Sequence, residues 1–258
     1  METMVKVDGG EVWAQDTGGA GSPLVLLHPG VGDSSIWDPV VPALTERHRV
    51  LRYDARGFGR SPRPDTRYSQ LRDLQAVLAH FGVERALFAA SSMGGSTSLS
   101  LAFAEPERVA GLALFVPGAT GAVGLASPEV NAEIERLAKA GDIEGVVRLS
   151  LRVWGACDEA PDGPAAAQLR SAIPAWFTTY AYDVADAPTY DRLHELTVPC
   201  VLALGERDQP EVIAFNEEMA ARIPGCRLVR LADSDHFPIL REPERVARLI
   251  LELSEQVA

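Results

Sequence analysis

The sequence lacks the features that would place the chain in a membrane or in an oxidising compartment. No apolar stretch approaches the ~18 residues that a transmembrane helix needs. The first ten residues carry charged side chains and no apolar segment, so they do not form a signal peptide. Only three cysteines occur in the 258 residues, and they have no C-x-x-C spacing. These absences predict a protein of the reducing cytoplasm.

Basic residues are also scarce, and no dense basic run occurs. The chain has 24 Lys and Arg against 36 Asp and Glu, which gives a formal net charge of -12. Such an acidic surface repels nucleic acids and anionic membranes, so we expect neither as a partner. No group of His and Cys has metal-ligand spacing, and we expect neither a metal nor another cofactor. A small-molecule substrate is the expected partner, and a homodimer is left open.

Apolar runs and helical stretches alternate along most of the chain. A hairpin pattern over residues 4–16 comes first, and the apolar runs read as strands at 23–27, 49–53, 86–90, 109–116, 198–204 and 226–231. Stretches with helical spacing separate them, including 36–46, 69–81, 211–223 and 242–257. Regular alternation of this kind predicts an α/β fold, a mostly parallel central sheet flanked by helices.

The pattern changes between residues 118 and 196, where no strong strand is found. Helix-like segments at 127–140, 142–153, 165–172 and 176–182 are separated by Pro and Gly. We interpret this region as a helical cap inserted into a core domain formed by 1–117 and 197–258. Aromatic residues concentrate in the cap, and such side chains commonly line ligand pockets. The predicted substrate-binding residues are Trp154, Trp176 and Tyr180 of the cap with Ser91 and Phe237 of the core.

Ser92 lies between an apolar run and a helix, in a cluster of small residues. It occupies the serine position of a G-x-S-x-G motif, in which Ala90 replaces the first glycine and Gly94 is the second. This motif is a sharp turn from strand to helix that exposes the serine hydroxyl above the sheet. Small residues are needed two positions before and after it because strand and helix approach closely. We therefore predict that Ser92 is a nucleophile.

A glycine-rich stretch, residues 28–35, follows the strand at 23–27. Backbone N–H groups in such a loop can face a ligand, and the loop after this strand supplies an oxyanion donor in serine-elbow enzymes. Gly30 is the predicted donor, with the N–H of Met93 as the second. His28 is expected to orient the loop rather than act as a base. Asp54 and Arg56, beside two glycines, are expected to build a rigid turn.

A serine hydroxyl needs a base, and the base needs an acid that fixes its tautomer. Among the five histidines, only His236 follows a strand near the end of the core. Asp208 follows the preceding strand, which gives the chain order Ser, Asp, His of serine-elbow enzymes. Asp233 and Asp235 are the rival acids. Their closeness to His236 in one loop disfavours them, so Asp208 is preferred.

Five stretches resemble the α/β-hydrolase fold superfamily, and together they extend over nearly the whole chain: residues 26–30, 53–61, 91–95, 205–208 and 235–238. Within it the chain looks most like capped esterases and enol-lactonases, with bromoperoxidase-like perhydrolases nearby. The resemblance implies acyl transfer to water through an acyl-enzyme. The chain departs from the usual pattern at Pro29, Ala90 and Ser91. A serine at position 92 argues against haloalkane dehalogenases and epoxide hydrolases, which use Asp there.

The sequence thus predicts a cofactor-independent serine hydrolase that cleaves a small to medium carboxylic ester or lactone. Two enzymatic alternatives use the same residues, hydrolysis of a C–C bond in a diketone and perhydrolysis. A hydrolase-like protein that binds a ligand without turning it over is the non-enzymatic alternative.

Overall fold

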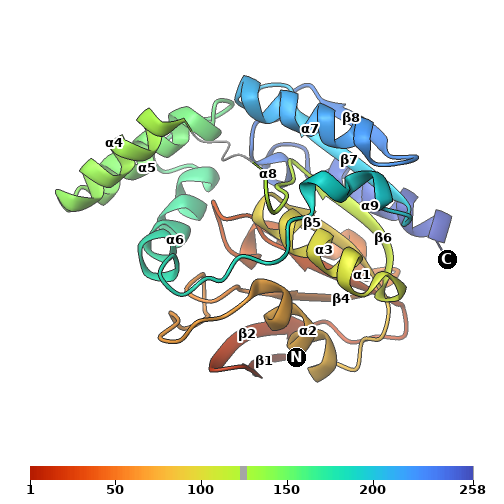
Figure 1. Cartoon of the computed structure of the whole chain (residues 1–258). Helices are drawn as coiled ribbons and strands as arrows, with labels where there is room; N and C mark the ends of the chain where they lie inside the picture. The colour runs from red at the N-terminus through yellow and green to blue at the C-terminus, as the bar shows by residue number, and fades with distance from the viewer. Residues whose placement is uncertain (123–126, 258) are drawn as a thin grey trace.

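A computed structural model describes residues 1–122 and 127–257. Its centre is an eight-stranded sheet in the order β1-β2-β4-β3-β5-β6-β7-β8 (Figure 1). Strands β1 and β2 pair antiparallel with each other and β2 antiparallel with β4, whereas all other pairs are parallel. The strands are β1 Glu2–Val7, β2 Gly10–Asp16, β3 Ser22–Leu27, β4 His48–Tyr53, β5 Ala86–Ser91, β6 Val109–Phe115, β7 Cys200–Gly205 and β8 Arg227–Leu231.

The central strands are apolar on both faces because helices cover both sides of the sheet. In β3, Leu24 and Leu26 face one core cluster while Val25 and Leu27 face the other, as the two-residue period of a strand requires. Helices α1 (Val41–Thr45) and α9 (Pro243–Val257) pack on the first face, and α2 (Gln70–His80), α3 (Met93–Ala104) and α7 (Pro210–Arg222) on the second. This arrangement confirms the predicted α/β fold.

The segment between β6 and β7 is helical in its described part. It contains α4 (Pro128–Lys139), α5 (Ile143–Trp154), α6 (Pro164–Thr179) and the 3-10 helix η3 (Tyr190–Glu195). Figure 1 shows α4 and α5 projecting at one side, with α6 between them and the sheet. Most of their buried apolar residues belong to the same cluster as one face of the sheet, and Ala172 and Ala175 of α6 belong to a smaller cluster with Ala55 and Phe58. The division into a core and a cap with boundaries at 118 and 196 stays a prediction.

Two helical elements differ from their sequence predictions. The stretches at 165–172 and 176–182 form one helix, α6, which continues through Pro174. Burial of its apolar face compensates for the hydrogen bond that this proline removes. The helix expected over 36–46 is instead the 3-10 helix η1 (Ser34–Trp37) followed by the short α1. Two prolines, Pro39 and Pro42, divide this stretch.

The remaining short elements complete the connections at the ends of strands. They are the 3-10 helix η2 (Pro106–Arg108), which follows α3, and the one-turn helix α8 (Pro238–Arg241), which follows the loop after β8. The loops that carry the predicted site residues follow the carboxyl ends of the parallel strands β3, β5, β7 and β8. Parallel sheets generally place their sites at this edge.

Candidate active site

Ser92 occupies a strained turn between β5 and α3. Its backbone has φ 46° and ψ −110°, a region that residues other than glycine rarely adopt. The turn is held by the Ser92 N–H, which donates to the carbonyl of Phe115 at 3.1 Å. At Gly94, a Cβ atom would lie 2.5 Å from the carbonyl oxygen of Leu27, so only glycine fits there. The tight packing explains why the sequence has small residues around Ser92.

The structure brings Ser92, His236 and Asp208 into one line of hydrogen bonds. His236 Nε2 lies 3.1 Å from Ser92 Oγ, and His236 Nδ1 lies 2.6 Å from Asp208 Oδ2. Asp208 and His236 follow β7 and β8, which are neighbouring parallel strands, and both side chains are buried. Three residues far apart in the sequence thus meet at the carboxyl edge of the sheet.

The surroundings of His236 favour its protonated form. Burial alone lowers the pKa of the ring, but the negative charge and the hydrogen bond of Asp208 act in the opposite direction, and Asp235 adds a further negative charge. The net effect is that the pKa of His236 is raised above its ordinary value of 6.5. A raised pKa makes the ring a stronger base for a neighbouring hydroxyl.

The rival acids occupy other positions. Asp233 is exposed and pairs with Arg207 at 3.1 Å. Asp235 is buried, pairs with Arg241 at 2.9 Å, and accepts hydrogen bonds from the N–H groups of Phe237 and Cys157. It organises the loop on which His236 lies. Of the carboxylates in the described residues, Asp208 holds the ring nitrogen Nδ1.

The side chain of His28 holds the loop at 28–35 in place through two hydrogen bonds. Its Nε2 accepts a hydrogen bond from the N–H of Ala55 at 3.0 Å, so the other nitrogen carries the proton and donates to the carbonyl of Pro29 at 2.8 Å. The ring is therefore neutral and orients the loop, as expected. Gly30 and Met93 are neighbours, since a Cβ atom on Gly30 would lie 3.7 Å from the Cβ of Met93. Met93 is the first residue of α3, where backbone N–H groups have no partner within the helix.

The turn after β4 has the structural character that its sequence predicted. Asp54 is buried and accepts hydrogen bonds from the N–H groups of Ser34 and Arg60, each at 2.8 Å. Arg56 is buried and forms a two-pronged ion pair with Asp73 at 2.7 and 2.8 Å. Among the described residues, neither Asp54 nor Arg56 forms a hydrogen bond or ion pair with Ser92 or His236.

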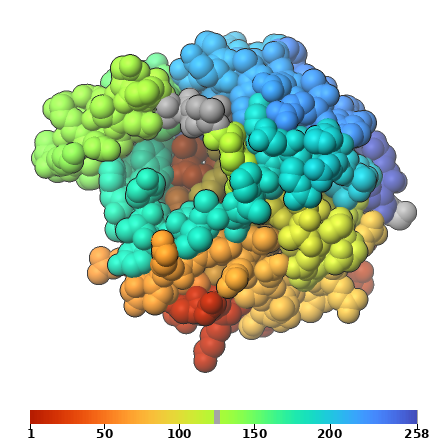
Figure 2. All heavy atoms as spheres, in the orientation of Figure 1, coloured from red at the N-terminus to blue at the C-terminus, as the bar shows by residue number. Residues whose placement is uncertain are grey.

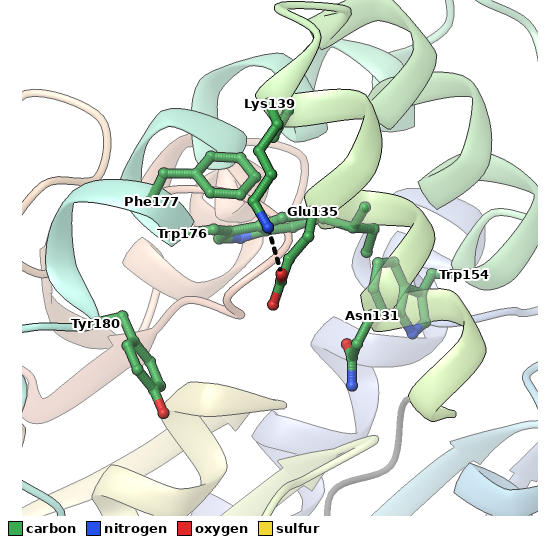
Figure 3. A pocket seen from close by; sticks show the side chains of 9 residues that line it. Asn131, Glu135, Lys139, Trp154, Trp176, Phe177 and Tyr180 are labelled. Carbon is green, nitrogen blue, oxygen red and sulfur yellow. Dashed lines mark hydrogen bonds and ion pairs between the residues drawn. The ribbon is translucent and has the colours of Figure 1, made fainter.

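A cavity of about 700 Å³ lies among α4, α5 and α6. Figure 3 shows the side chains that surround it, and Figure 2 shows a hollow between these helices. It is lined by Asn131, Ile134, Glu135, Ala138, Lys139, Trp154, Trp176, Phe177 and Tyr180. Three of the predicted substrate-binding residues are among them. The sequence analysis missed the α4 residues, although their spacing of three and four places them on one helical face.

The other two predicted substrate contacts lie elsewhere. Ser91 and Phe237 are fully buried and are not part of the cavity lining. The hydroxyl of Ser91 has no hydrogen-bond partner among the described residues. The role of Ser91 and Phe237 in substrate binding stays a prediction, because neither residue lines the cavity.

Two hydrogen bonds connect the cavity to the residues around Ser92. The N–H of His236 donates to the carbonyl of Trp154 at 3.1 Å, and the indole Nε1 of Trp176 donates to the carbonyl of Gly30 at 2.6 Å. The two tryptophan rings meet edge to face, with centroids 5.8 Å apart. Two residues of the cavity wall are therefore hydrogen-bonded to the loops of Gly30 and His236, although Ser92 and His236 do not line the cavity themselves.

The sheet order, the elbow at Ser92 and the helices on both faces define the class of the protein, an α/β-hydrolase fold. The alpha/beta hydrolase family matches residues 24–249, and the chain belongs to this family. Within the described ranges, no helix is both long and apolar enough to cross a membrane.

The comparisons with individual proteins point the same way. The chain is 29% identical over 245 residues to a pimeloyl-[acyl-carrier protein] methyl ester esterase of Nitrosomonas europaea, which covers 89% of this chain and 94% of the relative. It is similar to the solved enol-lactonase from Burkholderia xenovorans LB400, with TM-score 0.82 and 25% identity over 98% of this chain and 100% of the other. A putative carbamate hydrolase RutD of Azorhizobium caulinodans is 40% identical, but the match covers only 37% of each chain. The protein is a hydrolase similar to esterases and enol-lactonases.

Proposed function

We propose that the protein is a serine hydrolase that cleaves a carboxylic ester or lactone through an acyl-enzyme. The observation that carries this proposal is the continuous line of hydrogen bonds from Asp208 through His236 to Ser92, which ends at a hydroxyl on a strained elbow. Such a line is what an unactivated hydroxyl needs in order to act as a nucleophile.

In the proposed reaction, Ser92 Oγ attacks the carbonyl carbon and its proton passes to His236 Nε2. Asp208, at Nδ1, stabilises the imidazolium. The N–H groups of Gly30 and Met93 hold the negative charge on the carbonyl oxygen. His236 then gives the proton to the departing alkoxide as the carbonyl reforms, which leaves the acyl group on Ser92. A water molecule repeats the sequence, with His236 again as base, and releases the carboxylic acid.

The cavity among α4, α5 and α6 supports a substrate with an apolar group of small to medium size. Its walls are mostly aromatic and aliphatic, and their polar members include Glu135 and Lys139, which pair with each other at 3.1 Å. The names of the relatives, a methyl ester esterase and enol-lactonases, support an ester or a lactone. We propose that the helices around this cavity act as the cap that selects the substrate.

Turnover of p-nitrophenyl esters of graded chain length tests the proposal, with Ser92→Ala as the decisive variant. We expect wild-type turnover, covalent labelling of Ser92 by a fluorophosphonate, and loss of both in Ser92→Ala. Circular dichroism would verify that the variant folds. Retained turnover in a folded Ser92→Ala protein contradicts the mechanism. Lactones, a diketone and hydrogen peroxide, assayed in parallel, separate lactonase, C–C hydrolase and perhydrolase activity. A wild-type protein that binds these compounds without turnover would be a ligand-binding protein.

A further inference from the structure

One face of α6 holds the loop that contains Gly30. The N–H of Asp33 donates to Gln168 Oε1 at 3.0 Å, and Gln168 Nε2 donates to Ser35 Oγ at 2.9 Å. The hydroxyl of Ser171 donates to the carboxylate of Asp33. Gln168 and Ser171 are three positions apart and therefore neighbours on the helix surface, and Trp176 follows five positions after Ser171; all three reach the same loop.

Trp176 makes the contact nearest to the predicted oxyanion donor. Its indole Nε1 donates to the carbonyl of Gly30 at 2.6 Å. The ring is half-buried and packs, as Met93 does, against a small apolar cluster of Ala55, Phe58, Ala172 and Ala175. The indole is therefore held in place by its own helix and by the turn after β4.

Gly30 lies between two peptide groups, and a hydrogen bond anchors each of them. The peptide that carries the Gly30 N–H also carries the carbonyl of Pro29, to which His28 Nδ1 donates at 2.8 Å, and the next peptide carries the Gly30 carbonyl that Trp176 binds. Glycine has access to many backbone conformations, so fixing one of these peptides does not fix the other. An oxyanion donor lowers a reaction barrier only when it is oriented before the charge develops.

We propose that Trp176 is a positioning residue for the oxyanion hole: by anchoring the carbonyl of Gly30, it fixes the peptide after Gly30, while His28 fixes the peptide before it, and the two together hold the Gly30 N–H in one direction. Gln168 supports the same loop three and five residues further on, at Asp33 and Ser35. The inserted helix α6 thus contributes to the rate of the chemical step as well as to the binding of the substrate. This inference rests on the proposed function, because it assumes that Gly30 N–H contacts the reacting oxygen.

Arg170 provides a control on the same helix. Its guanidinium pairs with Glu144 of α5 at 2.7 Å, and Arg170 does not line the cavity. Arg170→Met removes a polar contact of α6 that does not reach the loop of Gly30. Trp176→Phe removes the hydrogen bond to that loop.

The experiment compares Trp176→Phe, Arg170→Met and Gln168→Met with the wild type on a p-nitrophenyl ester. An alkylboronic acid, whose serine adduct is tetrahedral, serves as an inhibitor that probes the oxyanion site. For Trp176→Phe we expect kcat to fall about 10- to 100-fold, somewhat less than when an oxyanion donor itself is lost. KM should change less than about threefold, and the boronate inhibition constant should rise with the loss in kcat/KM.

Each outcome decides between positioning and simple contact. Arg170→Met should keep kcat within about threefold, and Gln168→Met should lower kcat as Trp176→Phe does, but by less. If Trp176→Phe raises KM with kcat unchanged, Trp176 is only part of the cavity wall and the inference is wrong. If Trp176→Phe does not fold, an unchanged kcat in Gln168→Met overturns it instead. Failure of the proposed function would give a different result: the wild type itself would not be labelled by the fluorophosphonate at Ser92. In that case there would be no oxyanion hole for Trp176 to position.

Discussion

Replacing Gly205 by alanine tests whether the loop that carries His236 must sit where the structure places it. Gly205 is the last residue of β7, and its φ does not lie in the left-handed region. A Cβ atom there would lie 2.4 Å from the carbonyl oxygen of Asp235 and 2.5 Å from that of Ser234. The obstacle is backbone, so no side-chain rotation can relieve it.

The required movement can be read from these contacts. Ordinary van der Waals contact begins at 3.4 Å, so the loop backbone must retreat by roughly 1 Å. His236 is the next residue, and a comparable displacement would take its Nε2 beyond hydrogen-bond distance of Ser92 Oγ, now 3.1 Å away. Misplacement by 1 Å can cost about 100-fold in rate. We expect kcat to fall by about this factor and stability by about 1–3 kcal/mol.

The control is Gly111→Ala, in strand β6 of the same sheet. The nearest atoms to its added Cβ are Leu87 Cδ1 and the carbonyl oxygen of Pro199, both at 3.2 Å, and none belongs to the site. This variant should lose stability with little change in kcat. Ester turnover and thermal unfolding are measured for both variants. A folded Gly205→Ala enzyme with kcat within about threefold of wild type would refute the reasoning.

Three further predictions follow from other parts of the structure. His236 accepts a proton only when it is neutral, and its pKa is raised, so kcat/KM should rise with pH around a midpoint above 6.5. Asp208→Asn removes the negative charge that raises the pKa, and the midpoint should move to lower pH. Asp73→Asn leaves the buried Arg56 charge unpaired and should cost about 3–5 kcal/mol in urea unfolding. Pro174→Ala restores a helix N–H within α6 and should raise stability by about 1–3 kcal/mol, seen as a higher Tm.

The parts of the site that the sequence predicts well are those determined by the sheet. Ser92, Asp208 and His236 each follow a strand, and parallel strands place their carboxyl ends at one edge, so their meeting could be expected from chain order. The rival Asp235 could be disfavoured because it is adjacent to His236. The strands were also placed to within a residue or two, since fully buried strands are continuous apolar runs.

The contacts of the inserted helices could not be predicted in the same way. Trp176 shares one helix with Gln168 because α6 continues through Pro174, which the sequence indicated as a break. Side chains on a helix face point to partners that only tertiary packing determines. Ser91 ends strand β5 and its side chain is buried, so its contact with the substrate stays a prediction.

The inserted helices touch three of the loops that carry the proposed chemistry. Trp176 binds the loop of Gly30, the carbonyl of Trp154 accepts the N–H of His236, and the carbonyl of Val153 accepts from the side chain of Gln209, next to Asp208, at 2.6 Å. These contacts come from α5 and α6, which together with α4 line the cavity. In the proposed function, substrate selection and transition-state geometry share these two helices as a support. Substitutions in these helices that change chain-length preference should alter kcat as well as KM, whereas a cap that only covered the site would change KM alone.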